Sequence, residues 1–331
     1  MRRIFWLGAL LAVLVLAAYA TSPATARPTA PAPLPALGLP FQAATPTPTV
    51  SYDGLSIDEL TARSYGGGAI RVEAVMEERF PEFTRDLITY PSDGLTIYGF
   101  MNVPVGEGPF PVIIVLHGYI PPARYQTLAY TTLYANVLAK EGYITIHPNL
   151  RNFPPSDDGP NQFRTGYAID VLNLIALIRA QAGQPGPLER ADPDRIGLWG
   201  HSMGGGVTLR VMTITSDVRA AVMYAAVSGD ESLRYTSGRA RTGPIPPEGV
   251  LYRVSPINYL DRIQAPISIH HGLEDEVVPV AYSQDLCARL EALEQEFECF
   301  MYRDQPHTFV NGGDRLFMRR VSEFFAAHLQ P

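Results

Sequence analysis

The feature that most constrains the fold is a series of short, uninterrupted apolar runs from residue 111 onward. They occupy residues 111–117, 143–148, 195–200, 220–226 and 266–272. A strand that is buried on both faces of a parallel sheet has this appearance, because neither of its faces meets water. The runs therefore predict the inner strands of a mostly parallel sheet.

Helical stretches separate these runs, at residues 128–140, 169–182, 207–215 and 283–294. Strands that alternate with helices predict a parallel sheet with helices on both faces. Upstream, residues 83–104 alternate apolar and polar side chains around Ser92-Asp93-Gly94, which predicts an antiparallel hairpin at the N-terminal edge. The predicted fold class is α/β, with one sheet accounting for a single domain at residues 51–331.

The first fifty residues have a different character. Arg2 and Arg3 precede an apolar run at residues 4–20 that ends in the small-residue signal Ala18-Tyr19-Ala20, the layout of a secretory signal peptide. The alternative is an uncleaved membrane anchor, since about 17 apolar residues just reach the lower limit for spanning a bilayer. Residues 21–50 are rich in Pro, Thr and Ala and predict a disordered linker. We therefore expect a secreted protein with a signal peptide at residues 1–20.

Composition excludes several classes of partner. With 46% hydrophobic residues in 331, the chain can bury a substantial core. The net charge of −7 is spread along the chain, whereas a protein that binds nucleic acid normally carries a basic stripe. No metal-ligand spacing, dinucleotide-binding glycine motif or phosphate loop occurs in the sequence. We therefore expect no nucleic acid, no metal and no cofactor.

The segment Gly200-His201-Ser202-Met203-Gly204 lies between a predicted strand and a predicted helix. This is the G-x-S-x-G pattern of a nucleophile elbow. Side chains at the two flanking positions would collide with the neighbouring strand and helix, and glycine removes that collision. The turn presents the serine hydroxyl at a helix N-terminus, where backbone N–H groups point outward. We predict Ser202 to be a nucleophile; the alternative is a glycine-rich turn with an idle serine.

A serine hydroxyl is a poor nucleophile without a base to take its proton and an acid to orient that base. On this fold the acid and then the histidine follow the serine along the chain. Of the seven histidines, only His307 and His328 follow a plausible acid loop. His328 falls in the final predicted helix and is expected at the surface, whereas His307 lies in a loop after the apolar stretch at residues 297–302. We predict His307 to be the base.

The predicted acid is Asp275, which closely follows the last of the buried runs. Its neighbours Glu274 and Glu276 are expected to be solvated. Asp230, in the loop after the preceding strand, is the alternative acid.

The tetrahedral intermediate needs backbone N–H donors. We expect these from Met203, which follows the nucleophile, and from Tyr119, in the loop after residues 111–117. His117 is expected to orient that loop as a structural residue.

Four segments together resemble the catalytic domain of the prolyl oligopeptidase family, within the α/β-hydrolase superfamily. They are IGLWGHSMGGG, VIIVLHGY, HHGLEDEVVP and QPHTF, and the likeness covers about residues 83–329. The resemblance implies the α/β-hydrolase fold and the triad Ser202, Asp275 and His307. Full-length members of that family carry a large β-propeller, whereas only the linker and residues 51–82 precede Phe83 here. GHSMGGG also resembles cutinase-like polyester hydrolases and dienelactone hydrolases.

These patterns indicate a secreted serine hydrolase that cleaves peptide or ester bonds through an acyl-enzyme. Its substrate is expected to be a small ester or a short peptide. One alternative is a carboxylesterase or polyester hydrolase without peptidase activity. Another, from a different class, is a non-catalytic α/β-hydrolase that serves as a binding protein.

Cys287 and Cys299 are the only cysteines. The first lies in the predicted helix after the acid loop and the second in the strand that leads to His307. Consecutive elements of this kind pack against each other, so a disulfide is geometrically possible, and export to an oxidising compartment would preserve it. We expect this disulfide; the alternative is two buried free thiols.

Overall fold

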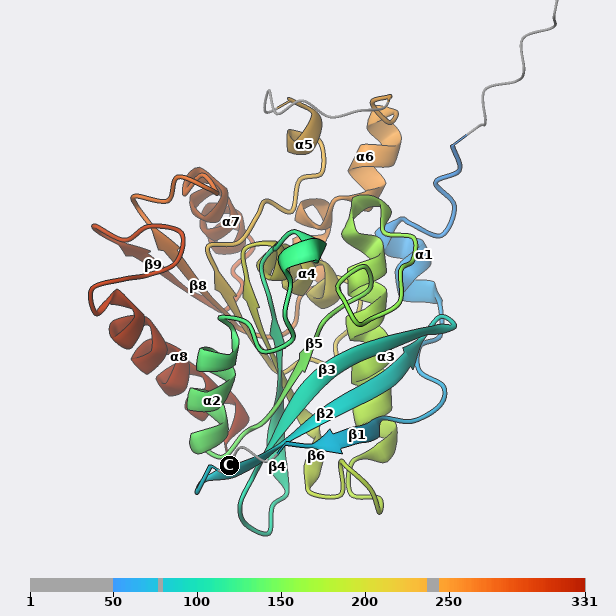
Figure 1. Ribbon diagram of the computed structural model, residues 1–331. Coiled ribbons are helices and arrows are strands. Elements are labelled where there is room, and N and C mark those ends of the chain that lie inside the picture. The colour runs from blue at the N-terminus through green and yellow to red at the C-terminus, as the bar shows by residue number, and fades with distance from the viewer. Residues whose placement is uncertain (1–49, 77–79, 237–243, 331) are drawn as a thin grey trace, which may run out of the picture. The chain divides into compact units, whose positions relative to one another are not determined.

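Nine strands form one mixed sheet in the computed structural model, which describes residues 50–76, 80–236 and 244–330 (Figure 1). The predicted signal peptide and the predicted linker up to Thr49 lie outside the described residues. The strands are β1 (Arg71–Val75), β2 (Phe83–Ser92), β3 (Leu95–Pro104), β4 (Phe110–Leu116), β5 (Ile144–Pro148), β6 (Ala191–His201), β7 (Ala220–Tyr224), β8 (Ile267–Gly272) and β9 (Phe297–Tyr302).

The order of the strands is β1-β2-β3-β5-β4-β6-β7-β8-β9. Pairing is parallel from β5 through β4 to β9, whereas β1, β2 and β3 join the sheet by antiparallel pairing. In the hairpin, Ser92 pairs with Leu95 across a turn in which Asp93 and Gly94 both have positive φ. The structure confirms the predicted fold class, a mostly parallel sheet with an antiparallel hairpin near its N-terminal edge.

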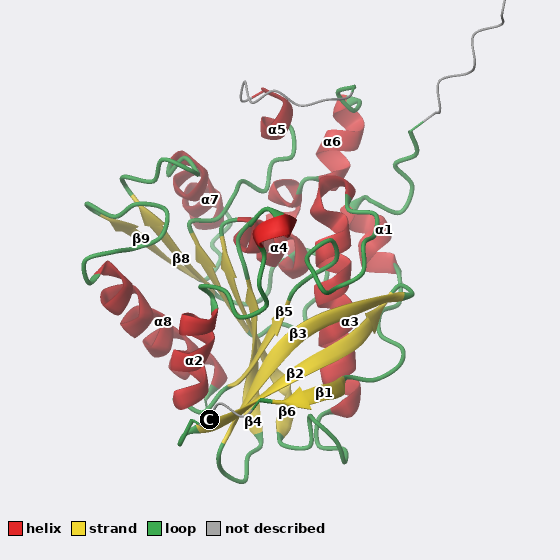
Figure 2. Ribbon diagram, in the orientation of Figure 1, coloured by secondary structure: helices red, strands yellow, loops and turns green. Residues whose placement is uncertain are grey.

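The helices lie on both faces of the sheet (Figure 2). They are α1 (Ile57–Ala62), α2 (Thr132–Lys140), α3 (Thr165–Gln181), α4 (Met203–Met212), α5 (Leu233–Thr236), α6 (Glu248–Val254), α7 (Ala281–Ala292) and α8 (Gly313–Leu329). Three short 3₁₀ helices accompany them: η1 (Pro122–Arg124), η2 (Gln162–Arg164) and η3 (Pro256–Arg262). Helices α3, α4 and α7 pack on one face of the sheet, and α2 and α8 pack on the other.

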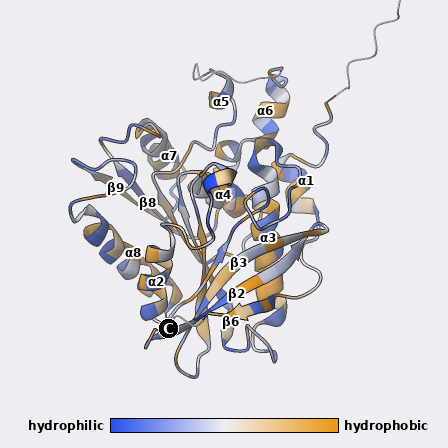
Figure 3. Cartoon of the chain, viewed as in Figure 1, coloured by the Kyte–Doolittle hydropathy of each residue, from blue (hydrophilic) through white to orange (hydrophobic). Residues whose placement is uncertain are grey.

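The uninterrupted apolar runs are explained by two separate cores. In β4, Val112, Ile114 and Leu116 belong to the core beneath α3 and α4, whereas Ile113 and Val115 belong to the core beneath α2 and α8. Successive side chains of a strand point to opposite faces, so a strand covered on both faces needs apolar residues at every position. Figure 3 shows orange along much of α3, which is buried along most of its length.

The short helices α5 and α6 were not predicted from the sequence, and neither were α1 and β1, which carry little sequence signal. All five residues of β1 are exposed, since it is an edge strand that pairs only with β2. Helix α1 has only six residues and begins with a capping box between Ser56 and Glu59. An exposed edge strand and a helix of under two turns bury too little to impose a periodic pattern.

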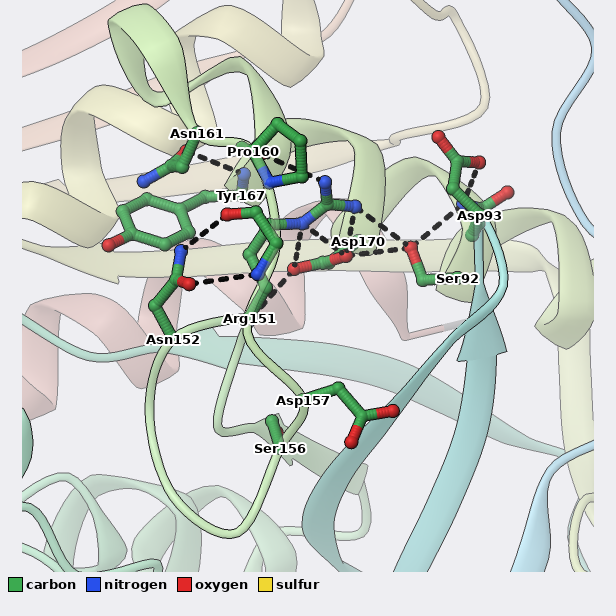
Figure 4. Close-up of polar contacts among 12 residues, drawn as sticks. Ser92, Asp93, Arg151, Asn152, Ser156, Asp157, Pro160, Asn161, Tyr167 and Asp170 are labelled. Carbon is green, nitrogen blue, oxygen red and sulfur yellow. Dashed lines mark hydrogen bonds and ion pairs between the residues drawn. The ribbon is translucent and has the colours of Figure 1, made fainter.

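A buried ion pair fastens the loop after β5 to α3 and to the β2–β3 hairpin (Figure 4). Arg151 donates to the carboxylate of Asp170 from its backbone N–H and from its guanidinium, both at 2.8 Å. Ser92, at the end of β2, donates to the same carboxylate at 2.6 Å. Another Arg151 N–H reaches the carbonyl of Pro160 at 3.0 Å. This loop leads into η2 and α3, so the ion pair orders a long connection above the carboxyl ends of the parallel strands.

Cys287 of α7 and Cys299 of β9 form a disulfide in the structure, which is the pairing expected from the sequence. It ties the helix after the Asp275 loop to the strand that precedes His307. Among the residues that the structure describes, no helix is long and apolar enough to cross a membrane.

Candidate active site

Ser202 lies between the end of β6 and the start of α4, at the turn predicted for it. Its backbone has φ 56° and ψ −113°, a conformation that residues with side chains rarely adopt. Two hydrogen bonds to the end of β7 and the loop that follows it hold this conformation. Ser202 N–H donates to the carbonyl of Tyr224 at 2.8 Å, and the N–H of Val227 donates to the Ser202 carbonyl at 3.1 Å. The turn therefore stores backbone strain beneath the candidate nucleophile, as an elbow requires.

The glycines on either side of Ser202 are required by close packing. A Cβ atom at Gly200 would lie 2.4 Å from the carbonyl oxygen of Gly204. One at Gly204 would lie 2.3 Å from the carbonyl oxygen of Leu116 in β4. Both separations are far below a van der Waals contact and involve backbone atoms that cannot move aside. The collision anticipated from the sequence is present at both positions.

Asp275 follows β8 and holds the imidazole of His307. Its Oδ2 accepts a hydrogen bond from Nδ1 of His307 at 2.7 Å, and its Oδ1 accepts from the N–H groups of Val277 and Val278, both at 2.8 Å. Burial favours the protonated carboxyl, but these hydrogen bonds and one from His271 outweigh it and hold the pKa of Asp275 well below its usual range. The carboxylate is therefore charged, and with the proton on Nδ1 the lone pair of His307 lies on Nε2, as a general base requires.

His307 is close to the elbow. Its ring centroid lies 4.7 Å from that of His201, the residue before Ser202, and its carbonyl oxygen accepts a hydrogen bond from Nε2 of His201 at 3.1 Å. Among the described residues no hydrogen bond joins Ser202 Oγ to His307 Nε2. In enzymes without substrate this bond is often long and tightens when substrate binds. The structure thus brings all three predicted triad residues to one end of the sheet.

The two predicted oxyanion donors lie beside the serine. A Cβ atom added at Gly118 would lie 3.2 Å from Ser202 Cβ, so the residue before Tyr119 is packed against the candidate nucleophile. Met203 N–H is the first amide of α4. Neither the Tyr119 nor the Met203 amide donates a hydrogen bond to another residue in the described part of the chain. Two free amides are therefore available to a developing oxyanion.

His117 is fully buried, with its two ring nitrogens each 2.7 Å from a backbone carbonyl oxygen, those of Gly118 and Asn149. Burial lowers the pKa of this imidazole. These contacts anchor the loop after β4, which is the structural role expected from the sequence.

Sequence reasoning did not predict that His271 belongs to the site. It is the penultimate residue of β8 and is fully buried. Its Nε2 lies 3.0 Å from Asp275 Oδ2, and its Nδ1 lies 2.7 Å from the hydroxyl of Ser283 in α7. The base was expected after the acid along the chain, whereas His271 precedes Asp275 by four residues. The doublet His270-His271 at the end of an otherwise apolar strand was the available signal.

The other candidates for the acid take other positions. Glu274 and Glu276 are exposed, as expected. Asp230 accepts a hydrogen bond from the N–H of Ser232 at 2.8 Å and makes none to His307. In this structure the carboxylate hydrogen-bonded to His307 is that of Asp275.

Glu231, next to Asp230, is fully buried in a cluster of arginines. Its Oε1 accepts from Arg164 at 2.6 Å and from Arg210 at 2.7 Å, and Arg234 lies 3.5 Å from Oε2. Burial raises the pKa of Glu231, but the guanidinium groups outweigh it and hold that pKa below its usual range. The cluster ties the loop after β7 to η2, α4 and α5. Within the described ranges, no group of three or more His, Cys, Asp or Glu side chains is arranged to hold a metal ion.

Comparison with known proteins shows which families and structures this chain resembles. The profile of the prolyl oligopeptidase family matches residues 186–331, and that of the alpha/beta hydrolase fold matches residues 111–244. A putative carboxymethylenebutenolidase from Synechocystis sp. is 24% identical over 67% of this chain and 85% of the relative. The uncharacterized peptidase YuxL of Bacillus subtilis is also 24% identical, over 72% of this chain but only 38% of the relative.

Solved structures share the fold at low identity. A puromycin-hydrolyzing peptidase from Mycobacterium tuberculosis superposes with a TM-score of 0.60 at 22% identity, covering 77% of this chain and 41% of that chain. Acetyl xylan esterase 1 from Thermoanaerobacterium sp. superposes with a TM-score of 0.58 at 18% identity, covering 81% and 90%. The chain thus spans about two fifths of the length of such peptidases and most of the length of the esterase.

Proposed function

Since the chain is a serine hydrolase with the α/β-hydrolase fold, we propose that it cleaves carboxylic ester bonds of small substrates through an acyl-enzyme on Ser202. The observation that carries this proposal is the hydrogen bond from His307 to the buried Asp275, next to a serine in an elbow and two free amides. Among the relatives matched over most of their own length, the putative carboxymethylenebutenolidase supports esters, whereas the uncharacterized peptidase YtmA of Bacillus subtilis keeps peptides as the second candidate.

The proposed reaction has two halves. Ser202 Oγ attacks the acyl carbon while His307 Nε2 takes its proton, and the amides of Tyr119 and Met203 bind the oxygen that becomes negative. His307 then gives the proton to the leaving alkoxide, and the C–O bond breaks. Water attacks the acyl-enzyme with His307 again acting as base, and the acid is released with Ser202 restored. Asp275 keeps the proton on Nδ1 throughout.

Short peptides are the second candidate substrates. The match of residues 186–331 to the prolyl oligopeptidase family supports them. The same residues would serve, because the two reactions differ in the leaving group, an amine instead of an alkoxide, that His307 must protonate.

The test is a panel of p-nitrophenyl esters of rising acyl length, run beside aminoacyl and prolyl p-nitroanilides. Ser202→Ala is expected to lower kcat on the best substrate by about 10⁴-fold to 10⁶-fold. Ser216→Ala is the matched control, since Ser216 is an exposed serine in the loop between α4 and β7. A fluorophosphonate should label the wild type at Ser202 only. Near-native activity of Ser202→Ala would refute the mechanism.

We also propose that the protein is exported. The support is the sequence pattern of residues 1–20, with two arginines before an apolar run and small residues at its end. N-terminal sequencing of the protein recovered outside the cytoplasm tests this. A mature start soon after residue 20 is expected, and a retained Met1 in the membrane fraction would instead support an anchor.

A further inference from the structure

Tyr130 lies in the loop between η1 and α2, and its hydroxyl contacts two parts of the site. The hydroxyl oxygen accepts a hydrogen bond from the N–H of Gly118 at 2.6 Å. The same oxygen lies 2.8 Å from Nδ1 of His201. Burial raises the pKa of Tyr130, so the hydroxyl keeps its proton. Because its oxygen accepts from Gly118, that proton is directed to Nδ1 of His201.

His201 continues the chain of hydrogen bonds. Burial lowers its pKa to about 3, so the imidazole is neutral near pH 7 and carries one proton. Nδ1 accepts from Tyr130, which leaves the proton on Nε2. Nε2 lies 3.1 Å from the backbone carbonyl oxygen of His307, which is the acceptor it requires. The tautomer of His201 is thus set by partners on two different loops.

Three catalytic segments are linked in this way. The chain runs from Gly118, beside the Tyr119 amide, through the Tyr130 hydroxyl and the His201 ring to the backbone of His307. We infer that Tyr130 and His201 are positioning residues. They fix the positions of three segments relative to one another: the oxyanion loop at Gly118, the nucleophile elbow and the loop that carries His307. The inference rests on the proposed function, since it assigns both residues to the same acyl transfer.

A role in positioning has a measurable consequence. A displacement of about 1 Å at reacting groups can cost on the order of 100-fold in rate. Without the Tyr130 hydroxyl, Gly118 N–H loses its acceptor and His201 Nδ1 loses its donor. The His201 ring can then take the other tautomer or turn, and the His307 loop loses its tie to the elbow.

The first test is Tyr130→Phe, which keeps the ring that packs edge-on against His201, with centroids 5.5 Å apart. We expect kcat to fall about 10-fold to 100-fold, with KM changed by less than about threefold, because the transition state is affected more than binding. Tyr90→Phe is the matched control. Its hydroxyl is also buried but has no hydrogen-bond partner among the described residues, so kcat should stay at the wild-type value.

The second test is a double-mutant cycle. His201→Gln also breaks the contact with Tyr130, while its amide group can still reach toward the His307 carbonyl. If the two residues act as one chain, the double variant loses no more than about twofold beyond the worse single variant. Losses that multiply would show two independent effects and overturn the inference.

A spectroscopic readout does not depend on turnover. Histidine ¹⁵N spectra of the full chain should show His201 protonated on Nε2, and Tyr130→Phe should shift its Nδ1 resonance. An unchanged Nδ1 resonance, or an active Tyr130→Phe enzyme with wild-type kcat, would overturn this inference alone. A wild-type protein that hydrolyses no member of the panel would instead overturn the proposed function, and this inference with it.

Discussion

Two buried carboxylates follow neighbouring strands of the parallel sheet but have different hydrogen-bond donors. Asp275, after β8, accepts hydrogen bonds from His307 and lies against His271. Glu231, after β7, accepts from Arg164 and Arg210. Both side chains have no exposed surface, and the pKa of each lies below its usual range.

The difference between them lies in what the partner can do with a proton. An arginine guanidinium stays charged near neutral pH, and this holds even for Arg210, whose pKa burial lowers to about 10. The Glu231 cluster is therefore a fixed set of charges that joins four segments. An imidazole gains and loses a proton near neutral pH, so the Asp275 site can stabilise a histidine that takes up a proton during a reaction. Because the two carboxylates are similarly buried, it is the difference between their partners that predicts a structural role for Glu231 and a catalytic role for Asp275.

Among the substitutions that test this comparison, Asp275→Asn has the largest expected effect. The amide cannot hold His307 in the required tautomer, and kcat should fall by about 10⁴-fold while the protein stays folded. The measurement is kcat on the best ester of the panel, with circular dichroism to confirm the fold. Asp230→Asn is the control, and its kcat should be near that of the wild type. A mild effect at Asp275 together with a severe one at Asp230 would move the acid to the loop after β7.

Glu231→Gln should lower the stability of the protein and leave kcat nearly unchanged, which is the opposite of what we expect for Asp275→Asn. Removing this charge leaves Arg210, which is 1% exposed, without compensation, and should lower the free energy of unfolding by about 3–5 kcal/mol. Urea unfolding measures this loss, with the exposed Glu248→Gln as control. For the molecules that remain folded, kcat should change little. A large loss of kcat without a loss of stability would give Glu231 a role in the reaction, and it would contradict the assignment of a purely structural role to this carboxylate.

The disulfide should stabilise the Asp275 side of the molecule. Cys287 and Cys299 are 12 residues apart in sequence, and closing a short loop of this kind contributes about 3 kcal/mol in the chain-entropy model. The double variant C287S/C299S should therefore unfold at lower urea, with kcat at 25 °C close to that of the wild type. Unchanged stability would mean that packing of α7 against β9 holds the two elements together without the disulfide. Labelling of two thiols in the unreduced wild type would show that no bridge forms.

Expressed as a free-energy change, His271→Ala should have the smallest effect of these variants, a loss of about tenfold in kcat. Asp275 loses one of its hydrogen-bond donors, and a bond to a charged group is worth about 1.5–3 kcal/mol, only part of which is felt in the transition state. His271→Gln keeps a donor at that place and should recover part of the loss. Equal kcat values for the Ala variant and the wild type would reduce His271 to a packing residue.

The pH dependence of the same variant gives a second readout. The depressed pKa of Asp275 contributes stability that is present above the ordinary aspartate pKa, about 4, and is lost as the pH falls through its folded value. Removing the His271 donor raises that folded pKa, so His271→Ala should unfold at a higher pH than the wild type during acid titration. Coincident acid transitions would contradict this assignment.

Much of this protein could be predicted from local sequence patterns. The apolar runs predict a sheet buried on both faces, because every residue of such a strand meets a core. Gly200 and Gly204 predict the elbow, because their positions admit no side chain beside a strained turn. Chain order and loop position predicted His307 and Asp275 as partners, since on this fold the carboxyl ends of the strands lie at one edge, and the structure joins the two by a hydrogen bond.

Other features were decided only by the tertiary structure. The contacts of Tyr130 with Gly118 and His201, and of Glu231 with Arg164 and Arg210, join segments whose separation no periodicity reports. Helix and strand patterns record which face of an element is buried, but not which polar side chains meet across a core. The partner of a buried polar group is set by the folded arrangement, because leaving it unpaired costs free energy that only a specific neighbour can offset.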